Sequence, residues 1–211
     1  MEPIKKSERF LKRLELSEPF EDDVEAYMIR IGVEIAARNG TERTLSTFAN
    51  AIRTRNDAAA KQIRFAPDFV AIDEAGVFYA EAKASISIEQ GPYENYMHLH
   101  SMGARLKLFV RPWPDDPNEK ARRLVYWNYI EEIRFVPNEI VVGRHPGNEF
   151  PIIDGWICPR SVDRQAGRGS GTPFKEIDLD SMIRIRDFYG DEPKIEATKD
   201  PVLNSPQMGL F

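Results

Sequence analysis

A scarcity of cysteine sets the first limit on this chain. Cys158 is the single cysteine, so no internal disulfide bond can form, and this usage is typical of a reducing compartment. No apolar run approaches the about 20 residues that a membrane-spanning helix needs. The first residues, MEPIKKSERFLKRLEL, carry too many charges for the apolar region of a secretory signal peptide. We therefore expect a soluble protein of the cytoplasm.

An overall excess of positive charge is also missing. The formal net charge is −5, which argues against a protein that binds nucleic acid through a uniformly basic surface. Cations are nevertheless concentrated between residues 38 and 64, where only Glu42 and Asp57 oppose them. These cations are Arg38, Arg43, Arg53, Arg55, Lys61 and Arg64. They indicate either the solvated face of a helix or a local surface for phosphate groups, and charge alone does not separate the two interpretations.

What the sequence does contain is the composition of an ordinary globular domain, with 42% hydrophobic and 30% charged residues among 211. Hydrophobic spacing and turn-forming residues predict both helices and strands. Helices are expected at about residues 17–39, 45–61, 92–103 and 177–188, and strands at about 69–72, 77–82, 105–111, 122–130, 138–143 and 150–158. The segment RSVDRQAGRGSGTP is expected to be a loop, and the chain from Gly190 onward a disordered tail.

The stretch PDFVAIDEAGVFYAEAKAS, residues 67–85, places charges where the pattern otherwise indicates two buried strands. Because side chains alternate along a strand, Glu81 and Lys83 lie on the same face. If the strands pair through a turn at residues 73–76, Asp68 approaches Glu81. Two adjacent carboxylates form a hard oxygen site that suits Mg²⁺ or Mn²⁺, and a neighbouring lysine can assist a nucleophilic water. A solvated hairpin is the alternative interpretation of the same charges.

The combination of Pro67-Asp68 with Glu81-Ala82-Lys83 resembles the PD-(D/E)xK signature of restriction-endonuclease-like nucleases. The resemblance covers about residues 17–112 and implies an α/β fold, with an αβββαβ core and a mixed central sheet flanked by helices. It implies that Asp68 and Glu81 hold Mg²⁺ or Mn²⁺ and that Lys83 assists the attacking water.

The segment FEDDVEAYMIRIGVE resembles the first helix of the same fold, which often adds an acidic residue to the metal site. Its position implies that Glu21 completes the site, with Glu25, one turn later, as the second candidate. Some members of the family also use a polar residue on the helix after the lysine. Gln90 and Tyr93 are the candidates for this role here.

A DNA nuclease also needs cations for the phosphate backbone of its substrate. The residues that we expect to bind DNA are Arg53, Arg55, Lys61, Arg64, Arg105 and Lys107, with Arg38 and Arg111 as neighbours.

The chain ends in SPQMGLF, in which Gln207, Leu210 and Phe211 resemble the QxxLF peptide that binds the bacterial DNA sliding clamp. A polar, flexible tail from Gly190 can present two apolar anchors to a preformed groove. The alternative is that Leu210 and Phe211 fold back onto the domain.

These observations predict one nuclease-like domain at residues 1–189, with a core at about 17–112, an extension at about 113–189 and a tail at 190–211. The expected function is that of a Mg²⁺-dependent deoxyribonuclease in DNA repair or replication, held near the nucleoid by a sliding clamp. A homodimer is compatible with this function. A catalytically inactive DNA-binding or clamp-regulating protein with the same fold remains the alternative.

Overall fold

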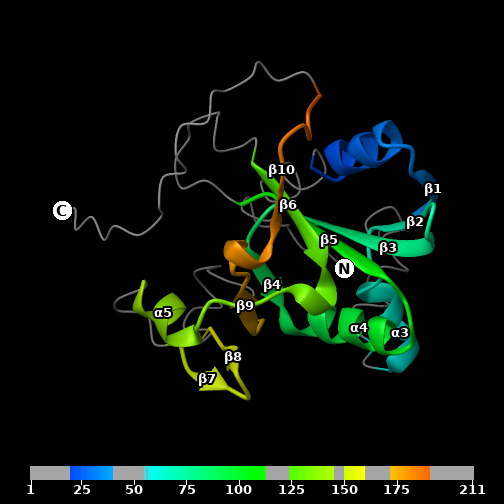
Figure 1. Ribbon diagram of the computed structural model, residues 1–211. Coiled ribbons are helices and arrows are strands. Elements are labelled where there is room, and N and C mark those ends of the chain that lie inside the picture. Colours follow the sequence, from blue (N-terminus) through cyan, green and yellow to red (C-terminus); the bar gives the residue numbers. More distant parts are fainter. Residues whose placement is uncertain are drawn as a thin grey trace, which may run out of the picture.

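The computed structural model describes residues 20–39, 55, 57–112, 124–144, 150–159 and 172–190, without the side chains of residues 58, 61 and 64. In these ranges the chain has a mixed α/β structure with a six-stranded mixed sheet, a small antiparallel sheet and few helices (Figure 1). None of the described helices combines the length and the apolar character needed to cross a membrane.

The six-stranded sheet is the centre of the molecule. In spatial order it contains β1 (Glu34–Arg38), β2 (Phe69–Asp73), β3 (Gly76–Lys83), β5 (Leu106–Val110), β6 (Val125–Tyr129) and β10 (Ile183–Ile185). Its neighbouring strands are antiparallel except β3 and β5, which are parallel. A parallel pair needs a crossover connection, and helix α4 (Gln90–Ser101) lies within it.

A smaller sheet lies beside the main one. Its order is β4 (Ser87–Glu89), β9 (Phe174–Glu176), β8 (Trp156–Ile157) and β7 (Ile152–Ile153). The turn between β7 and β8 contains Asp154 at φ 51° and Gly155 at φ 74°, as the favoured two-residue hairpins require. The remaining short elements are α3 (Ala58–Arg64), α5 (Asn138–Gly143) and the 3₁₀ turns η3 (Ile130–Glu132) and η4 (Leu179–Ser181).

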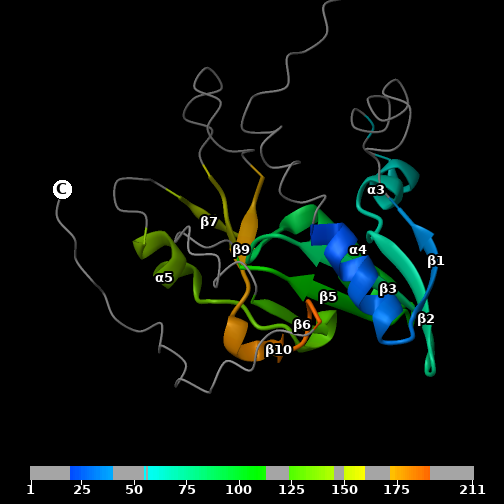
Figure 2. The same cartoon turned by 90° about the horizontal axis from the view of Figure 1, so that it is seen from above.

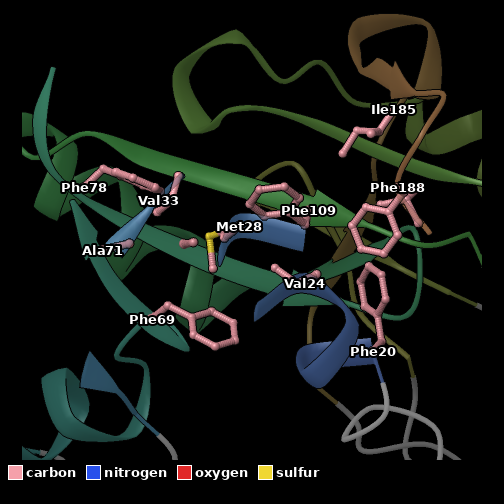
Figure 3. Close-up of a cluster of buried hydrophobic side chains, with 12 residues drawn as sticks. Phe20, Val24, Met28, Val33, Phe69, Ala71, Phe78, Phe109, Ile185 and Phe188 are labelled. Atoms are coloured by element: carbon pink, nitrogen blue, oxygen red, sulfur yellow. The ribbon is translucent and has the colours of Figure 1, made fainter. Parts of the chain in front are cut away.

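A helix at residues 20–30, here called the acidic helix, covers one face of the main sheet (Figures 1 and 2). Phe20, Val24 and Met28 recur every fourth residue, so they form one buried stripe. Figure 3 shows this stripe against side chains of the sheet, with Phe20 facing Phe188 from beyond β10.

Helix α4 lies on the opposite face of the sheet, below the strands in Figure 1. Its buried Tyr96 packs in a second core with Ile88 of β4 and with Leu106 and Leu108 of β5. Because both faces of the main sheet are covered, the side chains of β5 are nearly all buried.

Much of the expected order of elements is confirmed. The β2–β3 hairpin, helix α4 and strands β5 and β6 lie within a few residues of their predicted positions. The first helix, however, ends before Gly32, and residues 34–38 form β1 instead of continuing to Gly40. Gly32 has φ +83°, a conformation that ends a helix and favours glycine, and the following Val33 is buried.

Two further predictions are wrong. Residues 138–143 form helix α5, which begins directly after Pro137, instead of a strand. Residues 177–188 form η4 and β10 instead of a helix, because β10 pairs with β6 at the edge of the main sheet. Tertiary pairing overrides the local pattern in the second case. Most of the second predicted helix, the loop at 160–171 and the tail at 191–211 lie outside the described residues.

Candidate active site

The register of the β2–β3 hairpin brings Asp68 and Glu81 together. Phe69 pairs with Ala80, so Asp68, just before β2, stands opposite Glu81. The backbone N–H of Asp68 donates to Oε2 of Glu81 at 3.2 Å, and the N–H of Ala82 donates to Oδ2 of Asp68 at 2.8 Å. The two carboxylates are therefore fixed by backbone groups of each other's strands.

Lys83 joins this pair from the same face of β3. Its Nζ lies 3.1 Å from Oε1 of Glu81, and both side chains are largely buried. Burial by itself lowers the pKa of Lys83, but the carboxylates of Glu81 and Asp68 outweigh it, so the pKa is raised. The lysine is therefore a cation held inside the site.

One lysine does not neutralise two carboxylates. The pKa of Asp68 lies well above its usual value, first because the group is buried and second because Glu81 lies beside it. The Ala82 N–H and Lys83 act in the opposite direction with less effect. Asp68, Glu81 and Lys83, here called the carboxylate–lysine cluster, carry an excess of negative charge when both carboxylates are ionised, and a further cation would relieve it.

Tyr96 of α4 also contacts this cluster, although it is not among the residues that the sequence predicts for the site. The side chain is buried, and its hydroxyl donates a hydrogen bond to Glu81. Burial, followed by the charges of Glu81 and Asp68, raises the pKa of Tyr96 well above its usual value, so the phenol stays protonated. The sequence carries no clear signal for this role, because the contact of Tyr96 with Glu81 depends on how α4 packs against the sheet.

The two residues proposed for α4 lie elsewhere. Tyr93 packs against Phe135 and Trp156, with ring centroids 5.2 and 5.7 Å away. Gln90 donates to Glu94 at 2.7 Å. Neither contact reaches the carboxylate–lysine cluster.

Glu21 lies near the cluster but is held by another partner. Arg38, the last residue of β1, binds the acidic helix through Glu21 at 3.2 Å, Glu25 at 2.8 Å and Asp22 at 2.6 Å. The charge of Glu21 contributes to the raised pKa of Asp68, so the two groups interact electrostatically. Arg38, expected on a basic surface, instead joins the acidic helix to the edge of the main sheet.

Of the six residues expected to bind DNA, the structure describes the side chains of three. Arg105 and Lys107 both lie 2.9 Å from Asp73 at the turn end of the hairpin, opposite to the end that carries the cluster. Arg55 is exposed. Arg53 lies outside the described residues, as do the side chains of Lys61 and Arg64 and the tail residues Gln207, Leu210 and Phe211.

The donor set fits a hard divalent cation. Asp68 and Glu81 supply adjacent carboxylate oxygens, and the raised pKa of Asp68 records the repulsion that such an ion removes. Within the described ranges, no three side chains of His, Cys, Asp or Glu converge on one point. A metal ion bound here would have the carboxylates of Asp68 and Glu81 as ligands and would complete its shell with water, as Mg²⁺ commonly does.

Comparison of the chain with family models, with curated proteins and with solved structures gives no match.

Proposed function

We propose that this protein is a metal-dependent deoxyribonuclease of the restriction-endonuclease-like type, with Asp68, Glu81 and Lys83 as its catalytic residues. The observation that carries the proposal is the placement of Asp68, Glu81 and Lys83 at the open end of one hairpin, where Glu81 is buried, accepts from the Asp68 N–H and lies 3.1 Å from Lys83. Surface charges do not need such burial, whereas active sites often combine burial with like-charge neighbours.

The order of elements supports the same assignment. The acidic helix, β1, β2, β3, α4 and β5 follow one another as an αβββαβ series, with α3 inserted before β2. The carboxylates lie on the central hairpin of this series, and Glu21 projects from its first helix.

Each side chain has a distinct task in the proposed reaction. When bound, Mg²⁺ or Mn²⁺ supplies charge neutralisation and activation of a water molecule. Asp68 and Glu81 are its ligands, and the Ala82 N–H fixes the orientation of Asp68. Lys83 stabilises negative charge at the reacting phosphate and orients the attacking water. Tyr96 orients Glu81 through a hydrogen bond, and Glu21 adds negative charge that acts on Asp68.

The C-terminal QxxLF peptide suggests how the enzyme reaches its substrate. We propose that Gln207, Leu210 and Phe211 bind a bacterial-type sliding clamp. A second contact of this kind raises the local concentration of an acidic protein, net charge −5, near DNA. Deletion of residues 207–211 is expected to abolish clamp binding in a pulldown and to leave intrinsic cleavage nearly unchanged.

One observation favours a second candidate, a catalytically inactive DNA-binding or clamp-regulating protein. Both oxygens of Glu81 are already engaged, by Asp68 and by Lys83, and Glu21 is bound to Arg38. A cluster saturated in this way is also compatible with a purely structural role.

Cleavage assays separate the two candidates. Linear, nicked, branched and single-stranded DNA are incubated with Mg²⁺ or Mn²⁺ and the wild type, Asp68→Asn or Lys83→Met. Each substitution is expected to reduce the cleavage rate at least about 100-fold, because it removes a ligand or a charge that acts on the transition state. Glu74→Gln, in the exposed hairpin turn, is the matched control and is expected to keep the wild-type rate. Absence of cleavage by the wild type, or unchanged cleavage by both variants, overturns the enzyme proposal.

A further inference from the structure

A cavity of about 420 Å³ lies between the first turns of α4 and the segments that precede β2 and β9. Its volume falls in the range of about 300–1,000 Å³ found for ligand pockets. Its lining combines one aromatic ring, a proline ring, two carboxamides, a hydroxyl and a carboxylate, from Phe65, Gln90, Gly91, Glu94, Asn95, Thr172 and Pro173. Among the described residues, the lining contains no lysine or arginine, and its polar groups suit a neutral, flat, polar-edged group.

Helix α4 contacts both the backbone and the ring of Phe65. Asn95 donates from Nδ2 to the carbonyl oxygen of Phe65 at 2.9 Å. A Cβ atom added to Gly91 would lie 2.7 Å from Cζ of Phe65, so only glycine permits this approach. The segment before β9 is joined to the helix by a hydrogen bond, 2.8 Å long, from the Gln90 N–H to the carbonyl oxygen of Pro173.

Three connections link residues of the cavity to the carboxylate–lysine cluster. Phe65 precedes Asp68 by three residues, which span at most about 10 Å. Asn95 contacts Phe65, while the next residue, Tyr96, contacts Glu81. Glu89, directly before Gln90, contributes to the raised pKa of Lys83. A ligand in the cavity would therefore contact residues that are close in the chain to those of the proposed reaction centre.

We propose that this cavity receives an unpaired nucleobase next to the phosphodiester that is cleaved, so that the substrate class is single-stranded, flapped or branched DNA. The inference rests on the proposed nuclease function. A nucleobase has flat apolar faces for Phe65 and edges with donors and acceptors for Gln90, Glu94 and Asn95. A base stacked within a duplex cannot enter a side cavity unless it leaves the stack.

The test measures DNA binding by the full chain carrying Asp68→Asn, which prevents cleavage during the measurement. Fluorescence anisotropy is recorded with a set of single-stranded oligonucleotides, each with one abasic position, and with the matching duplexes. Loss of the base at one position is expected to weaken binding at least about 5-fold, because base–aromatic stacking is lost. Addition of Gly91→Ala, which displaces the Phe65 ring, is expected to remove this sensitivity.

Gly143→Ala is the matched control, because a Cβ at Gly143 meets nothing within 4 Å. It is expected to preserve the abasic sensitivity. If Gly91→Ala does not fold, Phe65→Leu replaces it, since leucine keeps apolar bulk without the ring.

Three outcomes overturn the inference: equal affinity at all abasic positions, a sensitive position unaffected by Gly91→Ala or Phe65→Leu, or equal binding of intact duplex. Parallel cleavage by the wild type separates the proposals. Cleavage with a uniform abasic series overturns the cavity assignment alone, whereas absence of both cleavage and DNA binding overturns both.

Discussion

The two ends of the β2–β3 hairpin each carry an aspartate beside cations, but the pKa values of the two aspartates are shifted in opposite directions. At the open end, burial and Glu81 raise the pKa of Asp68, although Lys83 lies nearby. At the turn end, hydrogen bonds from Arg105, and less strongly from Lys107, lower the pKa of Asp73 well below its usual range. Both ends pair carboxylates with cations, but one end has a surplus carboxylate and the other a surplus cation. Charge balance therefore distinguishes the candidate site from an ion pair that supports the fold.

The largest predicted difference concerns the two lysines. Lys83→Met leaves Glu81 buried without its cation, and loss of one partner of such a pair costs about 3 kcal/mol or more in the free energy of unfolding. Lys107→Met is expected to cost less than about 1 kcal/mol, because Arg105 still binds Asp73. Urea unfolding at pH 7 without divalent metal measures both values. Equal losses would show that the two ends are energetically alike.

Substitution of the two aspartates is expected to change stability in opposite directions. Asp68→Asn removes a repelled charge and keeps an oxygen for the Ala82 N–H, so it raises the free energy of unfolding by about 1 kcal/mol. Asp73→Asn weakens its bonds with Arg105 and Lys107 and lowers stability by about 1 kcal/mol. Thermal unfolding at pH 7 without metal provides the comparison. A loss of stability in Asp68→Asn contradicts the surplus charge at the open end.

The pH dependence of the same variants sharpens the comparison. The pKa of Asp68 is higher in the folded than in the unfolded chain, so the wild type loses stability as pH rises from about 3.9 through the folded value. The advantage of Asp68→Asn should therefore grow from acid to neutral pH. Asp73 has the opposite sign, because its contribution is present above about pH 3.9 and is lost as pH falls. The deficit of Asp73→Asn should shrink in acid, as unfolding curves from pH 3 to 8 can show.

The sequence predicts the hairpin well because its information is local. Alternation from Val77 to Lys83 defines the faces, and the turn at residues 73–76 defines the register that places Asp68 opposite Glu81. Gly32 and the Asp154-Gly155 turn are also local signals, but the predicted helix at residues 17–39 and the predicted strand at residues 150–158 run through them. β10 could not be predicted in the same way, because its three residues become a strand only through pairing with β6.

The environment of the site was less predictable than its carboxylates. Tyr96 reaches Glu81 only because α4 packs beneath β3, and no spacing in the sequence specifies that contact. The sequence places Arg38 in a basic segment, whereas in the fold it forms ion pairs with Glu21, Asp22 and Glu25. Contacts between elements far apart in the chain decide whether a charge is available to a ligand or bound within the protein.

Binding of Mn²⁺, measured by isothermal titration calorimetry at pH 7.5, tests the central claim most directly. The wild type and Asp73→Asn are predicted to show one saturable site, because the open end of the hairpin is intact in both. Asp68→Asn is predicted to show none, since it removes one of two carboxylate ligands. A site that persists in Asp68→Asn, or that is absent from the wild type, would contradict the assignment of Asp68 and Glu81 as a metal site.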